Sequence, residues 1–151
     1  MRTILDPTTD VGIRFRFKQL HPTSVARWGK TTAPRVVAHM AASFEEPLGE
    51  PPPPPRYRAF AKPSARWLYL HCVPCPARRS LVALEVLPEE IAGWQANVDA
   101  WYDACARFQT RGRAPAGPGF APHRLFGPLS AEEWGRLVFF HTDHHLRQFG
   151  L

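Results

Sequence analysis

Three histidines lie within five consecutive positions of the stretch "HTDHHLRQFGL" (141–151). His141 and His145 are four residues apart, so on an α-helix their side chains differ in direction by about 40° and stand about 6 Å apart along the axis. Two imidazoles in this arrangement can bind one metal ion. Thr142 stands where a zincin motif has its catalytic glutamate, so the pattern does not predict a metalloprotease.

The residues before this pair predict the direction in which it points. Trp134 and Val138 precede His141 along the same line of a helix, and both are apolar. Because the apolar stripe of a helix faces the core, we expect His141 and His145 to point into the protein. His144 is rotated by about 100° from His145 and is expected at the edge of this face. Such a pair also occurs by chance on helices, so the spacing alone does not establish a metal site.

A third histidine, His39, lies in another helical pattern far earlier in the chain. It stands beside Val36 and Met40 at helical spacing, on a face that is otherwise apolar. One buried histidine is most simply a core residue with a hydrogen-bond partner. Three inward-facing rings on two packed helices are harder to explain in this way, because each ring needs its own hydrogen-bond partner. The three can instead converge on one metal ion and leave positions for water or substrate, as catalytic sites do.

Two cysteines in "HCVPC" (71–75) form a competing metal candidate. Cys72 and Cys75 have CxxC spacing, but no second CxxC or CxxH follows at zinc-ribbon distance. The strand-to-helix context of a thioredoxin motif is also missing, so a cysteine-containing turn is the simpler interpretation. Cys105 falls on the apolar face of a helical pattern and is predicted to belong to the core.

Four stretches carry the start signals and the periodicity of helices. The first is ambiguous, because Asp6 and Pro7 form a typical helix start while "IRFRFK" alternates like a strand, and we favour a helix. The third is the strongest by pattern and has one wide apolar face, with Trp94, Trp101 and Cys105 among residues that recur at steps of three and four. The four predicted helices cover residues 6–20, 31–49, 87–110 and 130–150.

These elements predict an all-α fold, a four-helix bundle in a single domain over residues 1–151. The last helix opens with Ser130 and Glu133 at capping-box spacing. Five consecutive prolines within residues 50–55 must end the second helix and begin a long proline-rich connection to the third. Whether that segment is a lid, a partner-binding motif or a simple crossover stays open.

The composition excludes several classes of protein. Hydrophobic residues make up 44% of the 151 residues, enough for a core without disulfides. The net charge of +6 comes from scattered basic residues without a binding module, so no nucleic-acid partner is predicted. No stretch approaches the roughly 18 apolar residues of a membrane span, and "MRTILDPTTD" lacks the apolar region of a signal peptide. With three cysteines, an odd number, we expect a cytoplasmic, reducing location.

The histidines and their surroundings resemble a known group of proteins. His39 followed by the pattern "HxxxHxxQ" near the end of the sequence is similar to the DinB/YfiT-like superfamily, in a bacterial DinB-like branch of unassigned function. The stretches "ARWGKTTAPRVVAHM" and "LFGPLSAEEWGRLVFFHTDHHLRQFGL" carry the resemblance. It covers the whole chain and is loose over residues 45–85.

The resemblance implies a four-helix bundle that holds a divalent metal ion, zinc or nickel, through three histidines. Residue by residue, these are His39, His141 and His145. It also implies that Gln148 supports the site and that His144 is not a ligand. Relatives in the superfamily include transferases that use mycothiol or bacillithiol, and homodimers are common among them.

Two functions follow as hypotheses. The first is a metal-dependent enzyme that acts on a small-molecule substrate, either an S-transferase that uses a low-molecular-weight thiol or a hydrolase. The alternative is a non-enzymatic metal-binding or stress-response bundle protein, in which the histidines are structural. An open coordination position favours the first hypothesis, and a closed one favours the second.

Overall fold

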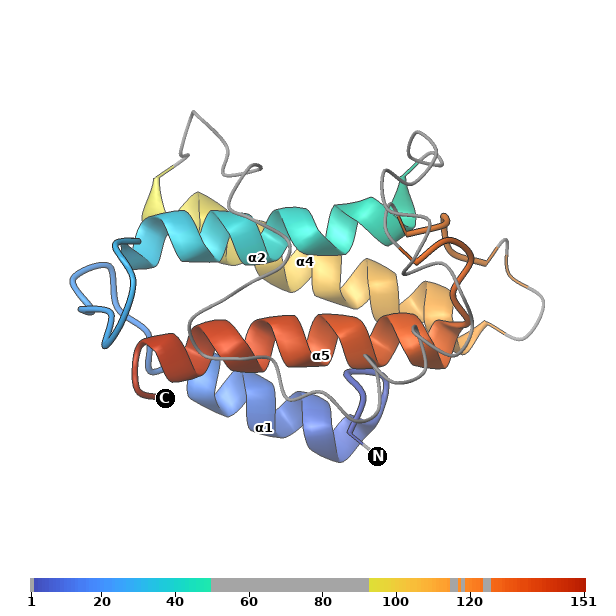
Figure 1. Ribbon diagram of the computed structural model, residues 1–151, viewed down its shortest axis with the longest axis horizontal. Coiled ribbons are helices and arrows are strands. Elements are labelled where there is room, and N and C mark those ends of the chain that lie inside the picture. The colour runs from blue at the N-terminus through green and yellow to red at the C-terminus, as the bar shows by residue number, and fades with distance from the viewer. Residues whose placement is uncertain (1, 50–92, 115–116, 118, 124–125) are drawn as a thin grey trace.

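The computed structural model describes residues 2–49, 93–114, 117, 119–123 and 126–151. These residues form four α-helices and no strand, so the predicted all-α, four-helix architecture is confirmed (Figure 1). The proline-rich connection, the CxxC motif and the predicted first turn of the third helix lie outside the described residues. The helices are α1 (Pro7–Phe17), α2 (Ala33–Leu48), α4 (Trp94–Arg113) and α5 (Ala131–Gln148).

Helix α1 resolves the ambiguity between helix and strand in its sequence. The Asp6 side chain caps the helix by accepting a hydrogen bond of 2.8 Å from the backbone N–H of Thr9. Ile13 and Phe17, four residues apart, are buried, whereas Phe15 between them is 68% exposed. Burial at this spacing is helical, and it explains why the alternating pattern does not form a strand.

The starts and ends of α2 and α5 follow the sequence signals closely. Ser130 and Glu133 form the predicted capping box, in which each side chain accepts a hydrogen bond from the other residue's backbone N–H. Gly150 takes a left-handed conformation with φ of 83° just after α5, which is the usual role of a glycine at that position. Thr32 occupies the N-cap position of α2, although its side chain makes no capping hydrogen bond.

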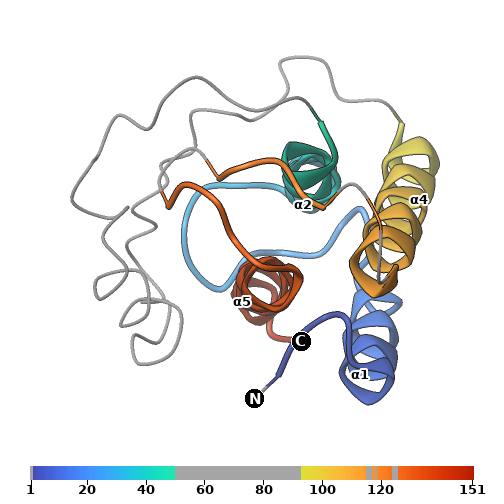
Figure 2. The ribbon, with the colours of Figure 1, turned by 90° about the vertical axis from the view of Figure 1, so that its right-hand side faces the viewer.

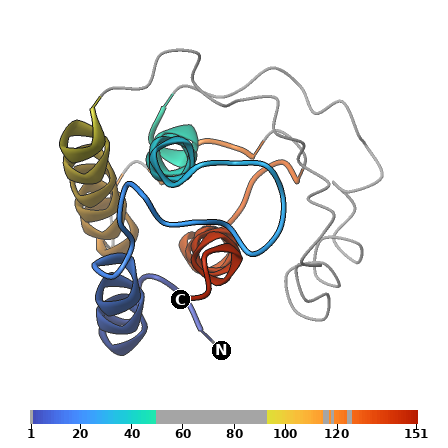
Figure 3. The same ribbon diagram turned by 90° about the vertical axis from the view of Figure 1, so that its left-hand side faces the viewer.

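Viewed along their axes, the four helices stand around a quadrilateral, with α2 between α4 and α5 and with α1 next to α5 (Figures 2 and 3). Helix α2 packs most extensively on α4, and α5 lies beside α1 and also contacts α2 and α4. Each of α2 and α5 therefore turns one face toward the other. The ligand candidates of the sequence analysis lie on these two helices, one on α2 and two on α5.

Aromatic side chains fill the core between α1, α2 and α4. Trp101 of α4 stacks on Phe17 of α1 with ring centroids 3.9 Å apart, and Phe44 of α2 meets Phe108 of α4 edge to face at 5.5 Å. Cys105 is fully buried in this core, as predicted. Burial raises the pKa of its thiol to about 12, so the thiol is protonated and unreactive at neutral pH.

An ion pair fixes the orientation of α5. Asp143 is 7% exposed and lies 2.6 Å from the Arg16 guanidinium of α1 and 2.9 Å from that of Arg147. Arg16 also donates a hydrogen bond of 2.9 Å to the Leu151 carbonyl. These contacts hold the last turns of α5 against α1, and they set the direction of the side chains on its opposite face.

The N-terminal segment packs against α5 where that helix carries a glycine. The Ile4 N–H donates a hydrogen bond of 3.1 Å to the Gly135 carbonyl, and Ile4 is buried. A Cβ atom at position 135 would overlap the Thr3 hydroxyl, so glycine allows this close approach without a shift of the Thr3 side chain. Gln109 of α4 completes the contact by donating a hydrogen bond of 3.0 Å to the Ile4 carbonyl.

Candidate metal centre

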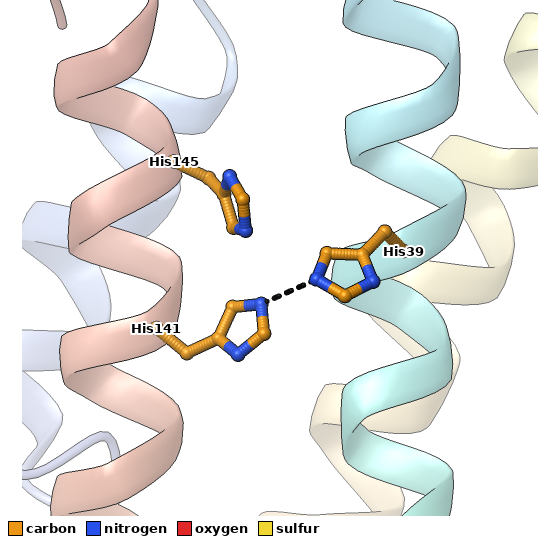
Figure 4. A group of neighbouring side chains, drawn as sticks. All are labelled: His39, His141 and His145. Atoms are coloured by element: carbon orange, nitrogen blue, oxygen red, sulfur yellow. Dashed lines mark hydrogen bonds between the residues drawn. The ribbon is translucent and has the colours of Figure 1, made fainter. Parts of the chain in front are cut away.

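The three predicted histidines come together between α2 and α5, with their rings directed toward one another (Figure 4). The ring centroids of His39 and His141 are 4.7 Å apart, those of His39 and His145 are 5.1 Å apart, and those of His141 and His145 are 4.8 Å apart. The rings thus form a nearly equilateral triangle. One ring nitrogen from each lies within 4.8 Å of the other two, which is the arrangement of groups that can hold a metal ion.

The apolar stripe of α5 places its two histidines. Trp134 and Val138 are each 2% exposed, and both stand on the line that continues to His141 and His145. On α2, Val36 and Met40 are buried beside the third ring. The histidines themselves are partly buried. They therefore stand beside the buried apolar residues of both helices, at the edge of the core.

Burial keeps the α5 histidines of the cluster neutral. It lowers the pKa of His141 well below the ordinary value of 6.5, and the neighbouring rings of His145 and His39 add to this effect because they disfavour a further positive charge. Burial lowers the pKa of His145 to about 4, although its hydrogen bond to Gln148 acts in the opposite direction. Both rings are neutral at pH 7 and keep a nitrogen lone pair, as a metal ligand must.

The donor geometry tests whether these residues suit a metal ion. Nε2 of His141 lies 2.9 Å from Nε2 of His39, so one of these two nitrogens carries a proton and donates a hydrogen bond to the other. Two nitrogens bound at roughly 2.0–2.1 Å to one tetrahedral ion stand about 3.4 Å apart. Small rotations that open this pair by about half an ångström, with each ring proton on Nδ1, therefore bring these two nitrogens to the spacing of ligands on one ion. Three neutral imidazoles suit zinc, nickel or copper, so the residues fit.

A chain of hydrogen bonds behind His145 fixes the position of its ring proton. The Trp28 carbonyl can only accept, so the 2.9 Å contact identifies its donor as Nε2 of Gln148. The remaining amide atom of Gln148, Oε1, can only accept, and it lies 3.0 Å from Nδ1 of His145. Nδ1 therefore carries the ring proton and Nε2 keeps its lone pair. A histidine that binds a metal ion through Nε2 needs this tautomer.

His144 lies beside the cluster without joining it. Its ring contacts Trp28 edge to face, with centroids 6.2 Å apart, and it stands 5.1 Å from the ring of His145. Burial lowers the pKa of His144, and the negative charge of Asp143 opposes that shift. The group of candidate ligands does not include His144, in agreement with the position at the edge of the face that its rotation on the helix predicts.

Trp28 and Gly29 also lie at this site, and no sequence pattern predicted them there. Trp28 contributes its backbone carbonyl, which every residue type possesses, so its identity carries no signal. Gly29 has a φ of 79°, in the left-handed region that favours glycine. The only available signal was the turn-forming glycine of "RWGK" just before the helix that carries His39.

The fold and the site define a class of protein: an all-α chain with a three-histidine cluster between two of its described helices. The chain belongs to DUF1569, a family of proteins of unknown function, whose sequence model matches residues 13–150. The match begins within α1 and includes the three histidines and Gln148. No curated protein and no solved structure matches the chain. Among the residues described, no helix is long and apolar enough to cross a membrane.

Proposed function

We propose that this protein is a divalent-metal-dependent enzyme of the DinB/YfiT-like superfamily, with His39, His141 and His145 as the metal ligands. The observation that carries the proposal is the triangle of imidazoles between α2 and α5. The four-helix architecture of the described residues agrees with it. The family assigns no function, so the superfamily, the reaction and the choice of zinc or nickel all belong to the proposal.

The chain's part in this function is to bring three imidazole rings together between α2 and α5. A divalent ion on these three neutral ligands would keep its double positive charge and would lower the pKa of a coordinated water or thiol. Three protein ligands leave a fourth tetrahedral position, and the rings are only partly buried. We infer S-transfer with a low-molecular-weight thiol, or hydrolysis, on a small-molecule substrate. The resemblance to the superfamily, rather than any residue of a substrate pocket, supports the choice of reaction.

One observation favours a second candidate, a non-enzymatic metal-binding or stress-response bundle protein. His39 and His141 satisfy each other through their 2.9 Å hydrogen bond, and His145 is satisfied by Gln148. The rings thus have hydrogen-bond partners within the protein, as histidines with a structural role would. Under this second function, replacing a histidine lowers stability but removes no activity.

The metal content of the purified protein tests the ligand assignment directly. Protein without a histidine tag is expected to contain about one divalent ion per chain by elemental analysis. His39→Ala and His145→Ala are expected to lose it, whereas His144→Ala keeps it because that ring lies outside the cluster. His144 is a matched control, since it is next to His145 on the same helix. Full metal content in both ligand variants would contradict the three-histidine site.

A substrate panel distinguishes the two candidate functions. Metal-loaded and metal-free protein are each incubated with low-molecular-weight thiols and carbon electrophiles, and with ester and amide substrates for the hydrolase. Metal-dependent S-conjugation or hydrolysis that is lost in His141→Ala supports the enzyme. Metal binding without turnover across the panel supports the binding protein. A homodimer and a cytoplasmic location stay predictions.

A further inference from the structure

Gly29 lies directly against the amide of Gln148, at the outer end of the hydrogen-bond chain that leads to His145. A Cβ atom at position 29 would stand only 2.8 Å from Nε2 of Gln148. That separation is well inside van der Waals contact, so the Gln148 amide would have to move. Gly29 also has a φ of 79°, and this left-handed backbone conformation independently favours glycine at the position.

The two residues before Gly29 are hydrogen-bonded to Gln148 at the end of α5. The backbone N–H of Arg27 donates a hydrogen bond of 2.7 Å to the Gln148 carbonyl. The Trp28 carbonyl accepts the 2.9 Å bond from Nε2 of the same residue. Arg27 and Trp28 therefore hold Gln148 by its backbone and by its side chain, respectively. The Gln148 amide cannot turn over without losing its hydrogen bonds to Trp28 and His145.

We propose that Gly29 is a positioning residue for the candidate metal centre. Its missing side chain lets the Trp28 carbonyl orient Gln148, and Gln148 in turn holds His145 with its proton on Nδ1. Any side chain at position 29 displaces the flexible end of Gln148 rather than the backbone, so the fold survives while the hydrogen-bond chain breaks. His145 then loses the acceptor that fixes its tautomer and orientation.

This inference rests on the proposed function only for its effect on metal affinity. The effect on the ring proton of His145 belongs to the metal-free protein and stands independently. Two measurements are therefore needed, one with metal and one without it.

The first measurement compares Gly29→Ala with Gly127→Ala. Both glycines have a positive φ, of 79° and 71°, but a Cβ at Gly127 meets nothing within 4 Å. The two variants thus share the backbone strain, and they differ in the overlap with Gln148. Zinc affinity, measured by competition with a chelator, is expected to fall roughly 10- to 100-fold in Gly29→Ala, as is typical when a group supporting a ligand is lost. Gly127→Ala is expected to match the wild type, and equal affinities in the two variants would overturn the proposal.

A double-variant cycle tests whether Gly29 acts through Gln148. Gln148→Ala alone is expected to weaken zinc binding to the same degree, and adding Gly29→Ala to it should weaken binding no further. Fully additive losses would mean that Gly29 affects the site by another route.

The second measurement determines the tautomer of His145 in the metal-free protein. Nitrogen NMR of histidine side chains is expected to show His145 with its proton on Nδ1 in the wild type and in Gly127→Ala, and a mixture of tautomers in Gly29→Ala. If the wild type binds no zinc, the proposed function fails, and this spectrum still decides the positioning role. An unchanged His145 tautomer in Gly29→Ala would overturn that role whatever the metal does.

Discussion

Three histidines within five positions of α5 have three different surroundings. The ring of His141 shares a hydrogen bond with His39, that of His145 is bonded to Gln148, and that of His144 packs on Trp28. Residue type cannot separate them, since all three are imidazoles. Their rotation around the helix does separate them, because steps of four keep two of them on one face and leave the third beside it.

The low pKa of His145 predicts an acid-sensitive fold. In the unfolded chain its pKa is near the ordinary value of 6.5, whereas in the folded protein burial lowers it to about 4. Below pH 6.5 the unfolded state therefore binds a proton that the folded state does not. The free energy of unfolding of the metal-free protein should be constant above pH 6.5 in this respect and fall as the pH drops toward 4.

Urea denaturation at a series of pH values measures this effect. The variant His145→Gln should show a shallower loss of stability between pH 6.5 and 4 than the wild type does. His21→Gln is the control, because His21 is exposed and lies outside the cluster. The prediction is wrong if the two variants have the same pH dependence.

At the scale of the helices, the placement of α5 depends on a buried carboxylate. Asp143 is nearly inaccessible and holds Arg16 of α1. Asp143→Asn removes the charge and leaves the Arg16 guanidinium, which is 25% exposed, next to a neutral amide, so we expect a loss of about 2 kcal/mol in the free energy of unfolding. Glu45→Gln breaks a comparable pair with Arg107 between α2 and α4, but both of its side chains are about half exposed. That loss should stay below about 1 kcal/mol.

Chemical denaturation of the two variants provides the comparison. Losses of equal size would mean that Asp143 is more solvated than its burial indicates. Zinc binding in Asp143→Asn gives a second readout, since a shift of α5 would also move the two histidines it carries.

The two helix starts provide a second prediction. Ser130→Ala removes the side-chain acceptor of the α5 capping box and should lower the free energy of unfolding by about 1 kcal/mol. Thr32→Ala should cost less, because the Thr32 side chain makes no capping hydrogen bond. Thermal denaturation of both variants measures the difference. A larger loss for Thr32→Ala would contradict the assignment of the caps.

These elements show which parts of the fold local sequence patterns can predict. The cap at Asp6, the box at Ser130 and the apolar steps on α2 and α5 are short-range features, so they predicted the helices and the faces that meet. Helix α4 ends at Arg113, whereas the sequence predicted an end at Thr110. Arg111 and Arg113 donate hydrogen bonds to backbone carbonyls of distant segments, and no local pattern predicts such partners.

The candidate site also combines features that the sequence predicted and features that it did not. Periodicity placed His141 and His145 on one face, and the bundle brought that face to His39. The role of Gln148 was implied only by the resemblance, while its contact with His145 is visible in the structure. The part played by Gly29 depends on the path of a loop and on an atom that glycine lacks. Residue type alone predicts neither of these features.

At the scale of the whole molecule, the proposed ion should stabilise the fold. Ligands from α2 and α5 exist together only in the folded protein, so binding adds to its stability by mass action. Free zinc at 100 times the dissociation constant should raise the free energy of unfolding by about 2.7 kcal/mol. Thermal unfolding with and without zinc measures the shift. His39→Ala should show little or none of it, and an equal shift in that variant would place the ion elsewhere.

The distance along the chain between the paired histidines has a consequence for assembly. His39 and His141 are separated by 102 positions. Bringing them together closes a loop of about a hundred residues. The chain loses the entropy of that loop before the contact between the two rings can stabilise it. The triangle of rings cannot form from a local segment, and α5 by itself supplies only two of its corners. Tight zinc uptake during refolding would therefore mark the moment at which the last helix docks onto α2, late in folding and well after the individual helices have formed.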